Sequence, residues 1–221
     1  HFAAEKGSTA MANYLLSKEA NPQAIDHEER TPLHIAAEEG HVAMANVLLD
    51  TKKVNIRAID KKKRTPLHRA AAGGHAAMTF ALLHHDAMAS DISAQQPLVN
   101  IIDQNKRTAL HDATSDGHEV TIKILLSHGA NPDIADDQNY TPVHIAAEEG
   151  NSKILKELLE TKPNLNARTA DGYTPLHLAT KGNHTDAMTL LLSAGASVHA
   201  LSNNYRTSLH IAAKYGHNLA I

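Results

Sequence analysis

Short apolar blocks alternate with polar turns along the chain and come in pairs. The first block of a pair has the form Leu-His-Ile-Ala-Ala (33–37), and a Gly separates it from a second block such as 44–49. These blocks predict a helix, a tight turn, a second helix and then a polar projecting loop. Because so short a helix cannot bury its apolar face alone, we expect neighbouring pairs to cover one another.

A four-residue motif, Thr-x-Leu-His with Val once in place of Leu, predicts where each first helix starts. Thr suits the N-cap because its hydroxyl accepts a hydrogen bond from a helix N–H, and Pro suits the first helical position. Successive motifs lie 34, 43, 33, 33 and 33 residues apart. A Gly should end each first helix, except that Asn183, within a glycosylation sequon, takes this place once and is interpreted as a cap. The motifs are Thr31–His34, Thr65–His68, Thr108–His111, Thr141–His144, Thr174–His177 and Thr207–His210.

Three blocks, TPLHIAAEEGH (31–41), TPVHIAAEEG (141–150) and DGYTPLHLATKGNH (171–184), resemble the ankyrin repeat. The resemblance covers essentially the whole chain. It implies an all-α ankyrin-repeat solenoid of stacked helix-turn-helix units, with β-hairpin fingers and first helices lining a concave groove that binds a protein. We expect a single array over 1–221 with seven repeats, the two terminal ones incomplete. Their approximate bounds are 1–28, 29–62, 63–105, 106–138, 139–171, 172–204 and 205–221.

One repeat is ten residues longer than the period of 33, and the excess lies at about 84–97. An insertion after a second helix should lengthen the loop before the next finger. It is either a dedicated partner contact or a tolerated surface insertion, because added loop length costs little closure entropy.

Two further departures concern single positions. The residue after the motif His is Arg69 in one repeat and Asp112 in the next, and these opposite charges predict an ion pair between the repeats. Each finger also has a position that often holds Gly in ankyrin-like repeats, and in this chain the residue at that position varies among the fingers. Fingers with large residues there either carry left-handed strain or use a different turn. The residues at that position are Glu29, Lys63, Lys106, Asn139, Gly172 and Tyr205.

Composition narrows the possible functions. The chain is 42% hydrophobic but 3% aromatic, which suits thin, closely approaching helices rather than a thick core. A net charge of −3 gives no overall attraction to nucleic acid, so we expect none to bind. The absence of Cys excludes disulfides and thiolate chemistry. Without a long apolar run or a signal-peptide pattern, we expect no membrane insertion by this segment and a cytoplasmic location.

The 17 histidines suggest metal or catalytic chemistry, but the repeat accounts for most of them. Seven occupy the last position of the motif, His1 included, and five follow the stop of a first helix. At both places the ring nitrogens should bond to nearby hydroxyl and backbone groups. The candidate metal clip that remains is His84-His85-Asp86, and consecutive residues rarely present two ligands to one ion. No phosphate loop or nucleophile elbow occurs, so we expect no metal, no cofactor and no catalysis.

Charged residues suggest a binding surface on the fingers and in the groove. A basic run over 52–64 could meet an acidic segment, an anionic lipid surface or a phosphorylated peptide, or could be a solvated finger tip. Two first helices end in the acidic pairs Glu38-Glu39 and Glu148-Glu149, whereas Lys181 and Lys214 stand at the ends of the first helices of later repeats. A groove of alternating sign favours one charged, extended partner in one register. The candidate partner-binding residues are Glu38, Glu39, Lys61, Lys62, Lys63, Arg64, Asp136, Asp137, Glu148, Glu149, Lys181, Lys214 and Tyr215.

These patterns favour a non-catalytic protein–protein interaction module. One alternative is an excerpt of a larger membrane channel or secreted toxin, where the array has a mechanical or oligomer-assembly role. Another is the targeting domain of a bacterial effector enzyme. Sequence on either side of the array would distinguish these three functions.

Overall fold

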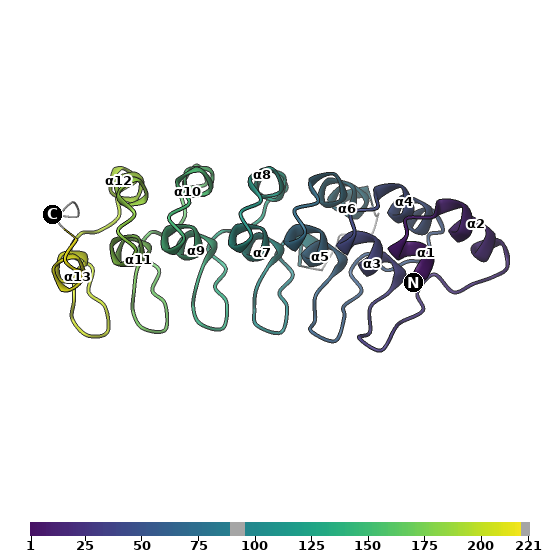
Figure 1. Ribbon diagram of the computed structural model, residues 1–221, viewed down its shortest axis with the longest axis horizontal. Helices are drawn as coiled ribbons and strands as arrows, with labels where there is room; N and C mark the ends of the chain where they lie inside the picture. The colour runs from purple at the N-terminus through teal and green to yellow at the C-terminus, as the bar shows by residue number, and fades with distance from the viewer. Residues whose placement is uncertain (89–95, 218–221) are drawn as a thin grey trace. The chain divides into compact units, whose positions relative to one another are not determined.

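A computed structural model describes residues 1–88 and 96–217 of the chain (Figure 1). Within these ranges the secondary structure is entirely helical, which confirms the predicted all-α class. No strand occurs in the described ranges, so the fingers are turns rather than the expected β-hairpins. The elements are α1 (Phe2–Glu5), α2 (Thr9–Ser17), α3 (Pro32–Glu38), α4 (Val42–Asp50), α5 (Pro66–Ala72), α6 (Ala76–Met88), the 3-10 helix η1 (Leu98–Asn100), α7 (Ala109–Ser115), α8 (Glu119–Ser127), α9 (Pro142–Glu148), α10 (Ser152–Leu159), α11 (Pro175–Lys181), α12 (Thr185–Ser193) and α13 (Ser208–Tyr215).

The chain forms two compact units, His1–Ala130 and Asn131–Ile221. In the first unit α1, α3, α5 and α7 pack side by side in one row, and α2, α4, α6 and α8 form a second row (Figure 1). In the second unit α9, α11 and α13 pack in one row, and α10 packs against α12. In both units the loops that join one helix pair to the next project beyond the row of first helices (Figure 1).

Each first helix begins at its motif through the same local contacts. In α3, the backbone N–H of Thr31 donates to Nδ1 of His34 at 3.1 Å, and the Thr31 hydroxyl lies 2.9 Å from that nitrogen. The same reciprocal cap occurs at α5, α7, α9, α11 and α13. The motif therefore satisfies helix N–H groups that would otherwise have no partner.

The other ring nitrogen of the motif His joins adjacent repeats. Nε2 of His34 donates to the backbone carbonyl of Arg64 at 3.0 Å, and Nε2 of His177 donates to that of Arg206 at 3.0 Å. Burial lowers the pKa of His34, and it lowers the pKa of His144 to about 4. The rings are therefore neutral at neutral pH, with Nδ1 accepting and Nε2–H donating. This confirms that the motif histidines are structural.

Small residues allow the helices to approach closely. Leu33, Leu67 and Leu110, in the first helices α3, α5 and α7, are fully buried. Ala36 and Ala70 of α3 and α5 are fully buried as well. A large side chain at these alanines would separate the helices, since packed interiors leave little spare volume. The Ala-rich composition is thus explained by helix packing.

The glycine that ends a first helix is required for two reasons. Gly40 has a φ of +72°, which favours glycine, and a Cβ there would lie 2.6 Å from Nδ1 of His75. This His follows the next helix stop, and its Nε2 donates to the Glu38 carbonyl at 2.8 Å. Asn183 adopts the same left-handed conformation with a φ of 58°, as predicted for a cap.

Part of the segment expected to form the inserted loop is helical, because 84–88 belong to α6. Helix α6 has 13 residues, whereas α4 and α8 have nine, and it continues through His84, His85 and Asp86 to Met88. The residues 89–95 lie outside the described part of the chain. After them, η1 packs against α6 and α7, with Leu98 buried.

Candidate functional site

The projecting turns, called the fingers below, are closed by a repeated set of hydrogen bonds. They comprise residues 26–30, 60–64, 103–107, 136–140, 169–173 and 202–206. In the second finger the N–H of Asp60 donates to the carbonyl of Arg64 at 3.0 Å. The Asp60 carboxylate then accepts from the N–H groups of Lys62 and Arg64 at 2.8 and 2.9 Å. Asp26, Asp103 and Asp136 do the same in their own fingers.

The variable position of each finger adopts a left-handed conformation. The φ values of Lys63, Lys106 and Tyr205 are 58°, 61° and 55°, close to that of Asn139 at 59°. Of the two alternatives left open by the sequence, the strained left-handed turn is therefore the one adopted. Such a conformation raises the energy of a bulky residue by roughly 1–2 kcal/mol relative to glycine.

Neighbouring fingers within a unit are joined by backbone hydrogen bonds. In the first unit the N–H of Lys61 donates to Glu28 at 3.0 Å, and that of Gln104 donates to Lys62 at 3.0 Å. In the second unit the N–H of Ala170 donates to Gln138 at 2.9 Å. Each unit therefore presents its finger tips in a fixed relative arrangement.

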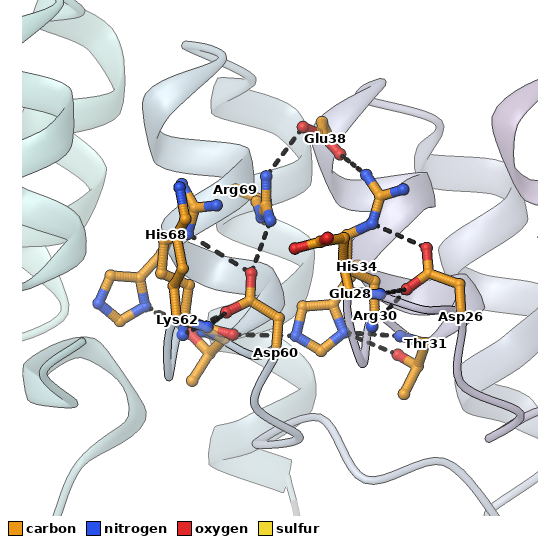
Figure 2. Close-up of polar contacts among 12 residues, drawn as sticks. Asp26, Glu28, Arg30, Thr31, His34, Glu38, Asp60, Lys62, His68 and Arg69 are labelled. Carbon is orange, nitrogen blue, oxygen red and sulfur yellow. Dashed lines mark hydrogen bonds and ion pairs between the residues drawn. The ribbon is translucent and has the colours of Figure 1, made fainter. Parts of the chain in front are cut away.

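A chain of alternating charges lies between the fingers and first helices of the first unit (Figure 2). This charge chain runs from Asp26 to Arg30 at 2.9 Å and from Arg30 to Glu38 at 3.0 Å. Glu38 also pairs with Arg69 at 3.0 Å, and Arg69 pairs with Asp60 at 2.6 Å. The side chains of Arg69 and Asp60 are largely buried, so solvent screens this pair weakly.

The predicted ion pair between Arg69 and Asp112 is wrong. Arg69 pairs instead with Asp60 and Glu38, on the side of the preceding repeat, and Asp112 pairs with Arg107 of its own repeat at 3.0 Å. Burial alone would raise the pKa of Asp60, but hydrogen bonds from the Arg64 N–H and the Arg69 guanidinium hold that pKa below its ordinary value. At Asp112 burial prevails over the interactions with His68 and Arg107 and raises the pKa of this carboxyl group.

The basic run separates into arginines that are partly buried in ion pairs and lysines that are exposed. Arg64 Nε lies 3.4 Å from Asp60, and the guanidinium of Arg57 makes two 2.9 Å hydrogen bonds to Asp86 of the extended α6. Lys61, Lys62 and Lys63 are exposed at the finger tip. Lys52 and Lys53 are exposed beyond the end of α4. Only the lysines of the run are therefore available to a partner.

The acidic candidates separate in the same way. Glu38 belongs to the charge chain. Glu148 accepts a hydrogen bond from the phenol of Tyr140. Burial, and to a smaller extent the Glu148 carboxylate, raises the pKa of Tyr140 to about 12. Asp136 is buried in its finger. Besides Lys61, Lys62 and Lys63, the exposed candidates of either charge are Glu39, Asp137, Glu149, Lys181, Lys214 and Tyr215.

Sequence reasoning missed an exposed aromatic side chain on α6. Phe80 is 50% exposed, its ring stacks on that of His84 with centroids 5.9 Å apart, and the ring of His128 meets it edge-on at 5.8 Å. The corresponding positions of the other second helices hold Asn13, Asn46, Lys123, Lys156 and Thr189. Comparing the second helices position by position, rather than counting apolar residues, would have found it.

The candidate metal clip does not form a ligand set. His84 stacks on Phe80, and the Asp86 carboxylate is engaged by Arg57. Residues 1–88 and 96–217 contain no cluster of three or more side chains suited to a metal ion. Within the same ranges, no helix has the length and apolar character needed to cross a membrane.

These helix pairs, caps and fingers define a repeat solenoid, and comparison with known proteins identifies its family. A family model described as "Ankyrin repeats (3 copies)" matches residues 1–96, 87–169 and 161–221, so the chain belongs to the ankyrin-repeat family. The crystal structure of the human ASB11 ankyrin repeat domain is similar, with a TM-score of 0.78 and 26% identity over 96% of this chain and 90% of that one. No curated protein matches the chain. Ankyrin repeats are generally protein–protein interaction modules and are typically non-catalytic.

Proposed function

We propose that this protein is a non-catalytic interaction module that binds a protein partner with its finger tips and the adjoining ends of its first helices. The observation that supports this most directly is the set of exposed charges on rigid turns. The side chains of Lys61, Lys62 and Lys63 project from a finger that Asp60 already holds in shape. A preformed surface loses less conformational entropy on binding than a flexible one does.

The proposal also covers the extent of the array. We propose a single array over 1–221 with seven repeats at the bounds given above. The supporting observation is that the Thr–His cap recurs at α3, α5, α7, α9, α11 and α13. In each of these helices the cap occupies the same place relative to the preceding finger.

The candidate residues differ in the roles that we propose for them. Glu38, Arg64, Asp136 and Glu148 are engaged within the fold, and we propose that they support the binding surface. We propose direct contact with the partner for the exposed set, which comprises Glu39, Lys61, Lys62, Lys63, Asp137, Glu149, Lys181, Lys214 and Tyr215.

Site-specific photo-crosslinking tests the function. A photoreactive residue is placed at Lys62 or Asp137 on the fingers, and as a matched control at Val120 or Thr189 on exposed positions of the second helices. We expect partner proteins to be crosslinked from the finger positions and not from the controls, as identified by mass spectrometry. Crosslinks from the second helices alone would contradict the proposal, and crosslinks between copies of the chain would favour the assembly role in a larger protein.

A further inference from the structure

We propose that two adjacent finger tips, 61–63 and 104–106, bind an acidic, extended segment of the partner, and that this segment carries a positive charge beside Glu28 and Glu29. The inference rests on the proposed function and names the chemistry of the partner. These residues are called the tip row below.

The first step is that the fold does not use the lysine charges of the tip row. Lys61, Lys62, Lys63 and Lys106 are all exposed. Among the residues that the structure describes, their ammonium groups take part in no ion pair. The nearby Arg57, in contrast, is neutralised by Asp86. The positive charge of the tip row is therefore available for an external carboxylate.

The second step is that two of these lysines occupy strained positions. Lys63 and Lys106 have φ values of 58° and 61°, at the position where Gly172 and Asn139 stand in the second unit. Glycine and asparagine adopt this conformation at lower cost than lysine. The turn sets this conformation in every finger, and Glu29 and Tyr205 also adopt it, with φ values of 60° and 55°. A lysine at a position where glycine would fit at lower cost is a reason to look for a function of the side chain.

The third step is the rigid spacing of the two tips. The N–H of Gln104 donates to the Lys62 carbonyl at 3.0 Å, and Asp60 and Asp103 each hold their own finger closed. Adjacent helices in such a row lie about 8–10 Å apart, and an extended chain advances about 3.3 Å per residue. Acidic residues three positions apart can thus face successive tips when the segment is in the polyproline II conformation, which advances about 3.1 Å per residue and returns to the same face every third residue.

The fourth step is the sign of the neighbouring finger. Lys61 donates its N–H to the Glu28 carbonyl at 3.0 Å, so the acidic pair Glu28-Glu29 lies directly beside the lysines. A uniformly anionic membrane would be repelled at that end of the row. A protein segment with a cation at one end and carboxylates along the rest satisfies both signs and fixes its register.

The choice of carboxylate over phosphate follows from the type of cation. Arginine binds phosphate through its two-pronged guanidinium, and the arginines nearest the tips, Arg64 and Arg107, lie against Asp60 and Asp112. The tips offer lysine ammonium groups, which act as separate point charges. Such an array suits several carboxylates spread along a chain better than one phosphate group.

Fluorescence anisotropy tests the inference with synthetic peptides and the whole chain. The probe is a labelled glutamate-rich peptide with a short lysine block at one end. The double variant Lys63→Gly, Lys106→Gly should weaken its binding about fivefold, as expected for two partly exposed ion pairs. It should not lower the unfolding midpoint, because glycine relieves the strain. Lys52→Gly, also exposed and at a φ of 55°, is the matched control and should leave affinity unchanged.

Two comparisons complete the test. Replacing the lysine block of the peptide by glycine should weaken binding to the native chain and should make no difference to a Glu28→Gln, Glu29→Gln variant. Equal binding of a glutamine-for-glutamate peptide, or tighter binding to phosphatidylserine vesicles or a phosphoserine peptide, would overturn the inference. Partner crosslinks on the fingers without glutamate-dependent binding would overturn it while leaving the proposed function in place.

Discussion

The Arg69 guanidinium lies 2.6 Å from the Asp60 carboxylate, so a first-helix side chain is paired with the finger that precedes its own helix. The same guanidinium reaches Glu38, one repeat earlier, at 3.0 Å. Arg69 thus joins a finger to two successive first helices, α3 and α5. Through this contact the fold stabilises the root of the basic finger that carries the proposed binding lysines.

Breaking this pair should destabilise the first unit. The variant Arg69→Met leaves Asp60 with a buried charge, and we expect a loss of about 2–3 kcal/mol in the free energy of unfolding. A double-mutant cycle of Arg69→Met with Asp60→Asn, measured by urea unfolding, should give a coupling energy of about 1–3 kcal/mol. The matching cycle of Arg69→Met with Asp112→Asn should give a value near zero. Equal coupling in the two cycles would contradict the observed pairing.

Much of the fold could be predicted from the sequence, because the repeat motif encodes local contacts. The Thr-x-Leu-His motif predicts both a cap and a helix start, and the structure has both at each complete motif. The partner of Arg69 could not be predicted in the same way. Asp60, Glu38 and Asp112 all lie within one repeat length or so, and the choice among them depends on the direction in which the side chain leaves α5.

The insertion shows a second limit of sequence reasoning. Its first residues, His84-His85-Asp86, carry no strong helix signal, and the period alone indicated an extended loop. The contact of Asp86 with Arg57, 29 residues earlier, is made from the extra turn of α6. Because this interaction is long-range, neither local propensity nor the repeat pattern indicates it. Phe80 was missed because apolar residues surround it in the sequence of α6.

Loss of the contact between Arg57 and Asp86 should unfold the extra turn of α6. We expect Asp86→Asn to lower the free energy of unfolding by about 1–2 kcal/mol, since the pair is partly buried and its two hydrogen bonds are charge-assisted. Amide hydrogen exchange should become faster at His84–Met88. Asp50→Asn, an exposed change at the end of α4, is the control and should alter neither quantity.

Two of the three variable finger positions of the second unit, Gly172 and Tyr205, should respond in opposite directions to substitution. Gly172→Ala should cost about 1–3 kcal/mol, because φ is +79° and a Cβ would lie 2.6 Å from the backbone nitrogen of Asn203. Tyr205→Gly should stabilise the chain by about 0.5–1 kcal/mol, since this exposed residue has a φ of 55°. Thermal unfolding of both variants beside the native chain measures the difference. A lower midpoint for Tyr205→Gly would show that its ring contributes more than the strain removes.

Stability should fall as the pH decreases below about 6.5, before the carboxylates titrate. Burial holds the pKa of His34, His68 and His177 below the ordinary value of 6.5, and that of His144 at about 4. Below pH 6.5 the unfolded chain binds protons that these folded rings do not, so protonation favours unfolding. The stabilisation is complete above the unfolded pKa and decreases as the pH falls toward the folded pKa.

The carboxylates act in a lower pH window, so the two effects can be separated. Asp26 and Asp60 have pKa values held below 3.8, and their contribution is lost only in stronger acid. We therefore expect the thermal midpoint to fall between pH 7 and pH 5. His144→Gln should reduce this slope, whereas His199→Gln, at an exposed position, should leave it unchanged. A midpoint that stays constant from pH 7 to pH 5 would mean that the folded and unfolded chains take up protons equally, and hence that burial does not lower the pKa of these rings.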